Sequence, residues 1–319
     1  MKCEDPNAIG DYIERCAILA SLIEVSSFPK PGNVHRLRNY EKTRFEHFLV
    51  GAVVSGAPLR RLAIRGFRVA TGELSFSRLA IGECILEAIR DTLSWQKGGN
   101  VNLGTLLLLA PLAASAGFVL AKYQKITAQN LRRTVRTVVQ NTTPEDAVHV
   151  YKAIRLASPG GLGRVEDLDV MEDTSLRKIL EKRITLYSIF KKYSYRDSIC
   201  KEWATGFSIT FTIGYPSLKC FLREIGDINK AVVMTFLKIL SSEPDTLIIR
   251  KSGYGKAKWV SETAKEILKR GGILTDEGIK LLWEFDEKLH SARGKLNPGT
   301  TADLTAASLF VLFLEGVRF

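Results

Sequence analysis

Acidic and basic side chains lie beside glycine- and proline-containing loops in several parts of the sequence. Glu24 ends an apolar stretch and is followed by the loop of residues 27–33, which contains Lys30. A carboxylate in apolar surroundings is expected to be either paired or functional, because burying an isolated charge is costly. We therefore predict that Glu24 is a general base, with a simple ion pair to Lys30 as the alternative.

Polar residues continue directly after this loop. Asn33, His35 and Arg36 are predicted to bind substrate together with Lys30. Glu46, on an expected helix, could turn inward beside Glu24 and act as a catalytic acid or a metal ligand. The alternative is an exposed Glu46, since acids are rarely buried.

A third group of charges surrounds a short apolar run near the C-terminal end. Asp245 precedes the run, and Arg250 and Lys251 follow it. Carboxylates can hold Mg²⁺ while arginine and lysine bind phosphate oxygens. Asp303 could face the same cation as Asp245, or it could simply lie favourably at the positive end of the last helix. The alternative for the Asp245 segment is a buried run flanked by solvated charges.

Hydrogen-bonding side chains occupy two further glycine-containing loops, and we predict that they orient the substrate: Asn100, Asn102, Asn297, Thr300 and Thr301. Glycine and proline let backbone N–H groups approach an anion, particularly where a loop opens a helix. Each loop could also be a plain helix connector. Four such loops, including residues 27–33 and 158–163, favour a phosphate-rich ligand.

The hydrophobic period along the chain is helical and predicts the elements that position these residues. Expected helices cover residues 9–25, 44–54, 77–95, 127–139, 144–157, 174–193, 199–213, 218–241, 257–270, 275–292 and 301–315. Residues 247–250 could form a short strand without an evident partner. Residues 103–121 carry no charge, but their glycines, proline and alanines favour a buried central helix over a membrane span. The fold class is therefore all-α, with residues 1–319 expected to form a single large multi-helix globular domain.

Composition limits the class of protein. The chain has 319 residues, of which 45% are hydrophobic and 25% charged, which excludes a disordered or fibrous protein. Lysine and arginine total 46 against 34 acids, and the net charge of +12 favours an anionic partner. The five scattered cysteines favour a reducing cytoplasm over a disulfide framework or a zinc site.

In their order along the chain, these loops resemble the triphosphoribosyl-dephospho-CoA synthase family. The resemblance extends from about residue 17 to residue 313. Its strongest points are Glu24-Val25 with residues 29–32 and Arg36, Gly99-Asn100 with Gly104, Asp245-Thr246, and Pro298-Gly299 with residues 302–304. It implies an all-α enzyme that joins the ribose C1 of ATP to the 2′-hydroxyl of 3′-dephospho-CoA and releases adenine. ATP and dephospho-CoA are then the expected partners, and Mg²⁺ the expected cofactor, held by Asp245, Asp303 and Glu46.

The chain departs from the family pattern at several points. His35 replaces the usual aspartate, and residues 100–104 lack the histidine and lysine of the family's Asn-Thr-His-Lys-Gly segment. The Gly-Ala-Arg-Gly-Glu-Ala segment is not recognisable, and the nearest stretch is Arg196-Asp197-Ser198 to Glu202. Residues 43–46 stand for the His-Asp-Met-Asp segment. The chain thus looks like a divergent member of an archaeal type, with the nucleotide part retained and the acceptor open.

Other classes of function remain as alternatives. A related ATP-using kinase or nucleotide hydrolase could use the same pocket. An RNA-binding protein is disfavoured, because the basic helix faces lack interleaved aromatic residues. These faces contain Arg61, Arg65, Arg68, Lys122, Lys125, Arg132, Arg133 and Arg136. No membrane partner is expected, and the oligomeric state is left open, with a homodimer as one option.

Overall fold

The computed structural model describes residues 5–163 and 165–319, so Cys3 lies outside the described chain. The helices are α1 (Pro6–Ser26), α2 (Phe45–Val54), α3 (Gly56–Ala70), α4 (Ile81–Trp95), α5 (Leu103–Tyr123), α6 (Ala128–Gln140), α7 (Pro144–Ala157), α8 (Asp173–Glu181), α9 (Leu186–Tyr193), α10 (Ser198–Thr205), α11 (Tyr215–Ile225), α12 (Ile228–Ser242), α13 (Thr246–Ser252), α14 (Tyr254–Lys269), α15 (Asp276–His290) and α16 (Gly299–Leu314). The described residues form no strand, which confirms the predicted all-α fold class.

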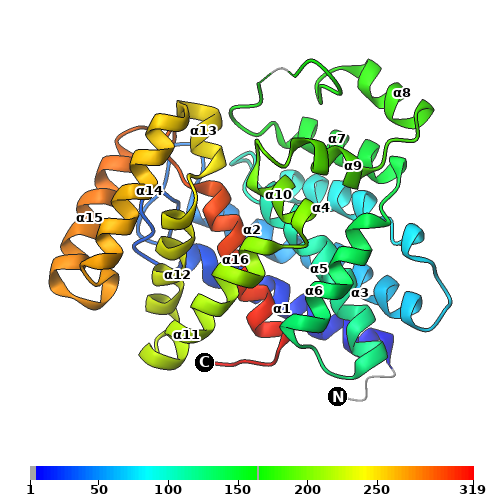
Figure 1. Cartoon of the computed structure of the whole chain (residues 1–319), viewed down its shortest axis with the longest axis horizontal. Helices are drawn as coiled ribbons and strands as arrows, with labels where there is room; N and C mark the ends of the chain where they lie inside the picture. The colour runs from blue at the N-terminus through cyan, green and yellow to red at the C-terminus, as the bar shows by residue number, and fades with distance from the viewer. Residues whose placement is uncertain (1–4, 164) are drawn as a thin grey trace.

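Helix α5 runs through the middle of the fold, where α1, α3, α4, α6 and α16 pack around it (Figure 1). Its side chains are apolar on every face, and most are buried. Two glycines allow the close contact between α3 and α5. A Cβ atom on Gly66 or Gly117 would lie 1.9 Å from a carbonyl oxygen of the facing helix. The small residues predicted to favour a buried helix therefore serve helix–helix contact.

Length and composition alone would let α5 cross a membrane, and it is the one described helix of which this is true. In the structure, 83% of its most apolar window is buried by the rest of the protein. Burial of this kind is typical of the core helix of a water-soluble protein. The buried central helix predicted for residues 103–121 is confirmed.

The C-terminal half builds a second hydrophobic cluster around α12, α14 and α15, beside the larger cluster around α5. Helix α16 touches both parts, because it contacts α1 and α5 on one side and α12 and α13 on the other. Figure 1 shows α16 in the centre, between the α12–α15 group and the helices around α5. The loop that opens α16 is thereby carried to the junction between the two parts.

Several local predictions need correction, among them the helix predicted for residues 199–213, which is interrupted after α10 at Gly206, where φ is 65°. Residues 247–250 belong to α13 and are not a strand, because Asp245 accepts hydrogen bonds from the Leu247 and Ile248 N–H groups and starts a helix. The helix predicted for residues 174–193 is divided into α8 and α9, with Arg183 at a positive φ of 52° in the break. The helix predicted for residues 218–241 is divided into α11 and α12 at Gly226, which has a φ of 71°.

Candidate functional site

A cavity of about 1690 Å³ opens where the predicted loops converge. Ligand pockets for one small molecule usually occupy ~300–1,000 Å³, so this cavity has room for two nucleotide-sized ligands. The first turns of α5 and α16 both reach it, and a helix N-terminus favours anionic groups. The sequence-predicted residues that line it are Glu24, Asn33, Asn100, Asn102, Arg250, Lys251, Asn297, Thr300 and Asp303.

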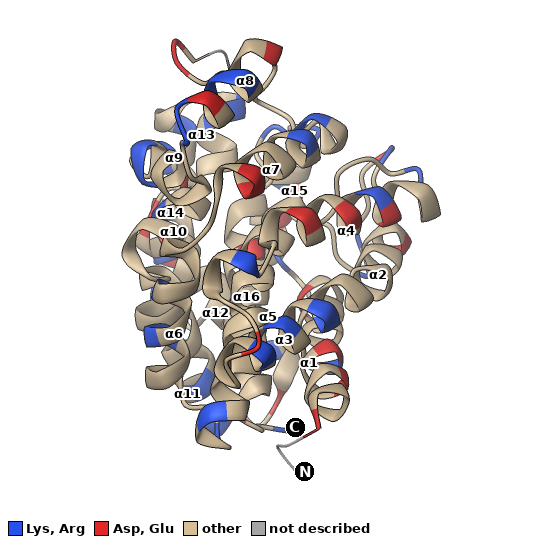
Figure 2. Cartoon of the chain, turned by 90° about the vertical axis from the view of Figure 1, so that its right-hand side faces the viewer, with Lys and Arg blue, Asp and Glu red and all other residues tan. Residues whose placement is uncertain are grey.

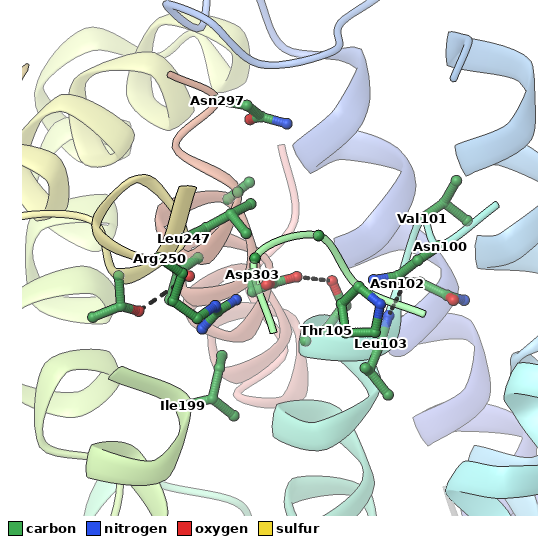
Figure 3. A pocket seen from close by; sticks show the side chains of 18 of the residues that line it. Asn100, Val101, Asn102, Leu103, Thr105, Ile199, Leu247, Arg250, Asn297 and Asp303 are labelled. Atoms are coloured by element: carbon green, nitrogen blue, oxygen red, sulfur yellow. Dashed lines mark hydrogen bonds between the residues drawn. The ribbon is translucent and has the colours of Figure 1, made fainter. Parts of the chain in front are cut away.

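Asp303 lies in the centre of this cavity, with Arg250 on one side and the Asn100–Asn102 loop on the other (Figure 3). Its Oδ1 accepts a hydrogen bond of 2.7 Å from the Thr105 hydroxyl. Burial, reinforced by the negative charges of Glu24, Asp245 and Asp197, raises the pKa of Asp303 to about 8. Asp303 is therefore a carboxyl group that is mostly protonated at neutral pH.

Glu24 forms a buried ion pair with Lys30 at the cavity wall. Burial raises the pKa of Glu24, opposed by the charge of Lys30, and burial lowers the pKa of Lys30. Lys30 is fully buried and does not line the cavity, so only the carboxylate of the pair faces the ligand space. The ion pair that was one alternative from the sequence is present, and Glu24 also lines the cavity, while its role as a general base stays a prediction.

Residues 158–163 and the end of α13 meet on the opposite wall. A Cβ atom on Gly160 would lie 2.8 Å from the Lys251 Cε atom, so the loop backbone and the end of this side chain lie in close contact. Arg250 pairs with Asp197, whereas the Lys251 ammonium donates to the Gly294 carbonyl oxygen at 3.2 Å. Burial and the charge of Arg250 lower the pKa of Lys251. Lys251 is thus a half-buried cation that lines the cavity, where an anionic ligand could contact it.

The amide side chains form the rim of the site. Asn100 accepts the Leu103 N–H, and Asn102 donates to the Gly51 carbonyl oxygen and the Thr92 hydroxyl. The buried Oδ1 of Asn102 has no hydrogen-bond donor within the described chain. The Asn33 amide donates to Asn297 Oδ1 at 3.2 Å, which joins the first loop to the last.

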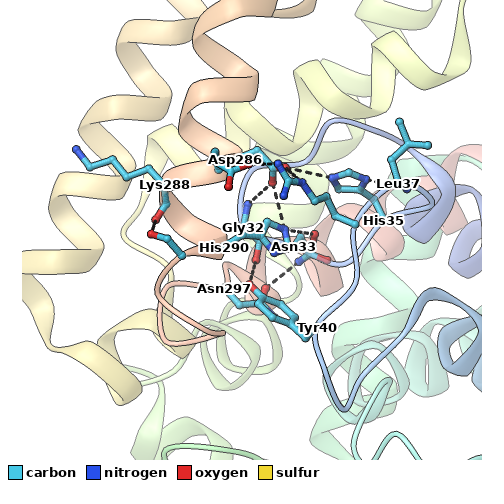
Figure 4. A network of polar contacts seen from close by, with 12 residues as sticks. Gly32, Asn33, His35, Leu37, Tyr40, Asp286, Lys288, His290 and Asn297 are labelled. Carbon is cyan, nitrogen blue, oxygen red and sulfur yellow. Dashed lines mark hydrogen bonds and ion pairs between the residues drawn. The ribbon is translucent and has the colours of Figure 1, made fainter.

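A second polar cluster lies behind this wall and anchors the loop after Lys30 to α15 (Figure 4). Asp286, which is fully buried, accepts the Gly32 N–H at 2.9 Å and lies 3.3 Å from Arg38 Nε. The His290 and His35 Nε2 atoms lie 3.3 and 3.6 Å from its carboxylate oxygens. Although burial opposes ionisation, these donors hold the pKa of Asp286 well below its usual range.

The ring nitrogens that face Asp286 carry protons, although His35 Nε2, at 3.6 Å, lies beyond hydrogen-bond distance. The Leu37 N–H donates to His35 Nδ1, so the His35 proton lies on Nε2. His290 Nε2 lies 3.1 Å from the Asn33 carbonyl oxygen, which can only accept, so this nitrogen is also protonated. The three side chains could bring ligand atoms within 4.8 Å of one another. With both nitrogens protonated, they form an anchor for the loop.

Several predicted site residues lie outside the cavity, and their contacts explain why. The expectation that Glu46 turns inward is wrong, because its side chain is 59% exposed and pairs with Arg44. Arg36 is exposed and stacks on the Phe28 ring at 4.1 Å, and His35 is buried against Asp286. The predicted substrate-binding roles of Arg36 and His35 have no support from these contacts.

Asp245 and Thr301 are buried and are hydrogen-bonded to each other. One Asp245 oxygen caps α13, and the other accepts the Thr301 N–H at 2.7 Å and the Thr301 hydroxyl at 2.8 Å. Four donors thus occupy the carboxylate, although burial raises its pKa. The geometry indicates that Asp245 fixes α13 to α16, and it does not place Asp245 opposite Asp303 as a second metal ligand.

The sequence reasoning missed Thr105 and Arg38, and it left the cavity residues of the 193–197 region without a role. Asp197 was noted only as the counterpart of a lost family segment, yet it lines the cavity and pairs with Arg250. That family correspondence was the available signal for Asp197. Nothing in the sequence pointed to a role for Thr105, because a threonine within an apolar helix is common.

The basic helix faces considered as an RNA-binding surface are partly neutralised. Arg61 pairs with Glu87, and Arg65 with Glu83 at 3.1 Å. Figure 2 shows lysine and arginine interleaved with acids on the face formed by α3 and α4. The second face is not neutralised in this way, because Arg132 and Arg136 donate to backbone carbonyl oxygens and Arg133 donates to the Tyr123 hydroxyl.

The fold and the site define a class: an all-α enzyme whose large cavity, with several cationic side chains in its wall, can accept anionic substrates. The family model for the ATP:dephospho-CoA triphosphoribosyl transferase matches residues 10–318, and the chain belongs to this family. The 2-(5''-triphosphoribosyl)-3'-dephosphocoenzyme-A synthase of Klebsiella pneumoniae is 25% identical over 304 residues, covering 94% of this chain and 90% of the relative. A crystal structure from Archaeoglobus fulgidus, assigned as a triphosphoribosyl-dephospho-coA synthase, is 28% identical with a TM-score of 0.60, covering 83% of this chain and all of its own. The resemblance predicted from the loops is confirmed.

Proposed function

We propose that this chain transfers the triphosphoribosyl group of ATP to a hydroxyl group of a nucleotide acceptor, with 3′-dephospho-CoA as the expected acceptor and adenine as the second product. The observation that carries the proposal is a two-nucleotide cavity lined by the family's own loops, in a chain that matches the family over residues 10–318. Transfer of this kind passes through a state with positive charge on the ribose. The cavity acids are suited to stabilise that charge.

The triphosphate is proposed to lie against the wall formed by residues 158–163 and α13. Lys251 and Arg250 supply charge there, and Arg196 and Arg293 also line the cavity. Arginine suits bidentate contact with phosphate, and the glycines of the loop let backbone N–H groups come close. Asn100, Asn102, Asn297 and Thr300 are proposed to orient the ribose and the base.

Glu24 is proposed to take the proton of the attacking hydroxyl. Lys30 favours the ionised carboxylate, which a base needs, while burial raises the pKa of Glu24 and strengthens it as a base. Glu24→Gln should lower kcat about 10²–10⁴-fold. Glu46→Gln, which removes an acid on the protein surface, should retain activity. Equal losses in both variants would contradict the assignment of Glu24.

Mg²⁺ is an expected companion of ATP, but its three predicted ligands do not all line the cavity. Mg²⁺ is usually held by one or two carboxylates together with substrate phosphates. Of the three predicted ligands, Glu46 is on the protein surface, and the Asp245 carboxylate already accepts four hydrogen bonds. Asp303 is the remaining predicted ligand. We therefore derive no step through a protein-bound ion and propose that Mg²⁺ enters with the triphosphate.

The test is identification of the products. Purified protein is incubated with ATP, Mg²⁺ and 3′-dephospho-CoA, and the mixture is resolved by mass spectrometry. Adenine is expected in equal amount to a triphosphoribosyl adduct of the acceptor. ADP in place of adenine would contradict ribosyl transfer and indicate phosphoryl transfer. Because residues 100–104 lack the family's histidine and lysine, acceptors related to dephospho-CoA belong in the same assay.

Cytoplasmic location and a homodimer are further proposals. The described cysteines are free thiols, in keeping with a reducing compartment: Cys16, Cys84, Cys200 and Cys220. Light scattering of the purified protein tests the dimer, and a monomeric mass at assay concentration would contradict it.

A further inference from the structure

The cavity extends beyond its polar centre into a part with apolar walls, which we call the apolar lobe. Its walls come from α5, α7, α9 and α10, and α9 contacts α7 and α10, while α5 contacts the same two helices. Figure 3 shows Ile199, which lines the cavity from α10, below Arg250 of the charged wall. The lobe is therefore continuous with the space proposed for the nucleotides. It is lined by Leu106, Tyr151, Ile154, Ile189, Phe190 and Ile199.

The spacing of apolar residues along these helices makes a wall without charge. Tyr151 and Ile154 lie on one face of α7, and Ile189 and Tyr193 on one face of α9, because side chains three or four positions apart are neighbours on a helix. On α5, the residues beyond Thr105 that line the cavity are all leucines. None of the cavity-lining residues on α5, α7 or α9 is charged.

The hydroxyl groups of the two tyrosines are already bound to backbone. The Tyr151 hydroxyl donates to the Leu168 carbonyl oxygen at 2.8 Å, and the Tyr193 hydroxyl donates to the Asp167 carbonyl oxygen. A triphosphate in the lobe would therefore meet no cation from α5, α7 or α9, and burial of charge without a partner is costly. The hydrophobic effect instead favours an uncharged, largely apolar group.

We propose that the apolar lobe holds an uncharged arm of the acceptor, so that the acceptor is a nucleotide that ends in such an arm. This inference rests on the proposed ribosyl transfer and names the class of its acceptor. The lobe and the polar centre belong to one cavity, so a ligand that fills both has a charged end and an apolar end. 3′-Dephospho-CoA meets this requirement, because it is ADP with an uncharged pantetheine arm on its terminal phosphate. Burial of the arm then distinguishes it from shorter adenine nucleotides.

The test is a calorimetric titration with two ligands that differ only in the arm, 3′-dephospho-CoA and ADP. Ile154→Asp places a charge on the lobe wall at a partly exposed position. The Kd of 3′-dephospho-CoA should rise at least about tenfold, the usual size of a mismatch in an apolar pocket, while the Kd of ADP should stay within about twofold. Ile154→Trp, which fills the lobe without adding charge, should also weaken 3′-dephospho-CoA and spare ADP. Leu156→Asp, at an exposed position of α7 outside the cavity, is the matched control and should leave both values unchanged.

Two results would overturn the assignment of the lobe. Equal losses for both ligands in the Ile154 variants would place the purine or the phosphates, and not the arm, against this wall. A loss of 3′-dephospho-CoA affinity no larger than in Leu156→Asp would show that the lobe does not contact the acceptor. Because the titration needs no turnover, its outcome is independent of adenine release. A wild-type protein that binds 3′-dephospho-CoA through the lobe and releases no adenine would overturn the proposed ribosyl transfer alone, so the two failures are distinguishable.

Discussion

Asp286 and Asp303 lie on the consecutive helices α15 and α16, and their surroundings give them opposite properties. Asp286 faces the Gly32 N–H, the Arg38 guanidinium and two imidazole nitrogens. Asp303 accepts a hydrogen bond from one hydroxyl group, and three other acids act on it through their negative charge. The pKa of the first is held well below its usual range, and that of the second is raised to about 8. Burial acts in the same direction on both, so the donors around each carboxyl group decide the difference.

The comparison separates an anchor from an acid that lines the cavity. Ionised Asp286 fixes the segment that contains Asn33 and Tyr40, because Tyr40 stacks on His290 at 4.8 Å and donates to the Gly32 carbonyl oxygen. That segment forms one wall of the cavity that contains Asp303. Asp286 and its donors therefore lie behind this wall, whereas Asp303, which has a single hydrogen-bond donor, lies on the cavity side of it.

The largest expected effect on stability comes from removing the anchor. Asp286→Ala should lower the free energy of unfolding by about 3–5 kcal/mol, because it leaves the buried Gly32 N–H without its acceptor and removes the buried negative charge beside Arg38. Asp276→Ala, an exposed position on the same helix, should change it by no more than about 0.5 kcal/mol. Urea unfolding of both variants measures the difference. A loss below about 1 kcal/mol in Asp286→Ala would show that Asp286 is not an anchor.

The next effect concerns the position of Asp303. Gly104→Ala places a methyl group where Asp303 Oδ2 lies, so the carboxyl group or the start of α5 must move. A displacement of about 1 Å at a reacting group can cost about 10²-fold in rate. We expect a loss of that order in kcat. Gly255→Ala is the control, since a Cβ atom there meets open space and should leave kcat unchanged.

The two aspartates should also respond oppositely to pH. Folded Asp303 keeps its proton up to about pH 8, while the unfolded chain releases it near pH 4, so its contribution to stability declines as pH rises between these values. Asp286 has a depressed pKa, so its contribution is present above about pH 4 and is lost as pH falls further. Unfolding free energies of wild type minus Asp303→Asn, and of wild type minus Asp286→Asn, should therefore slope in opposite directions. Parallel curves would contradict the comparison.

The smallest effect is expected at Arg36, two residues before Arg38. Arg36→Ala removes a stack on Phe28 at the surface, worth about 0.5–1 kcal/mol in stability, and should leave KM for ATP unchanged. Arg250→Ala, at the cavity wall, should raise that KM. A rise in KM for Arg36→Ala as large as that for Arg250→Ala would place Arg36 in the site after all.

Some of the site could be predicted from the sequence because its signals are local. Glu24 and Lys30 are six residues apart, and Arg250 and Lys251 are adjacent, so a charge in an apolar run was visible in each case. Loops carry no periodicity, however, and the direction of a loop side chain cannot be deduced from its neighbours. For this reason Arg36 and His35 were predicted in the cavity, while Arg38 was overlooked.

The sequence by itself determined the all-α fold and the buried central helix, because apolar spacing and capping residues act over one or two helical turns. It also indicated the family, because the characteristic loops keep their order along the chain although the sequence has diverged. Only the tertiary structure decided which acid became an anchor and which stayed protonated. Gly32 is 254 residues from Asp286, and Thr105 is 198 residues from Asp303. A carboxyl group's pKa depends on the donors and charges that folding brings beside it, and here those partners come from the other end of the chain.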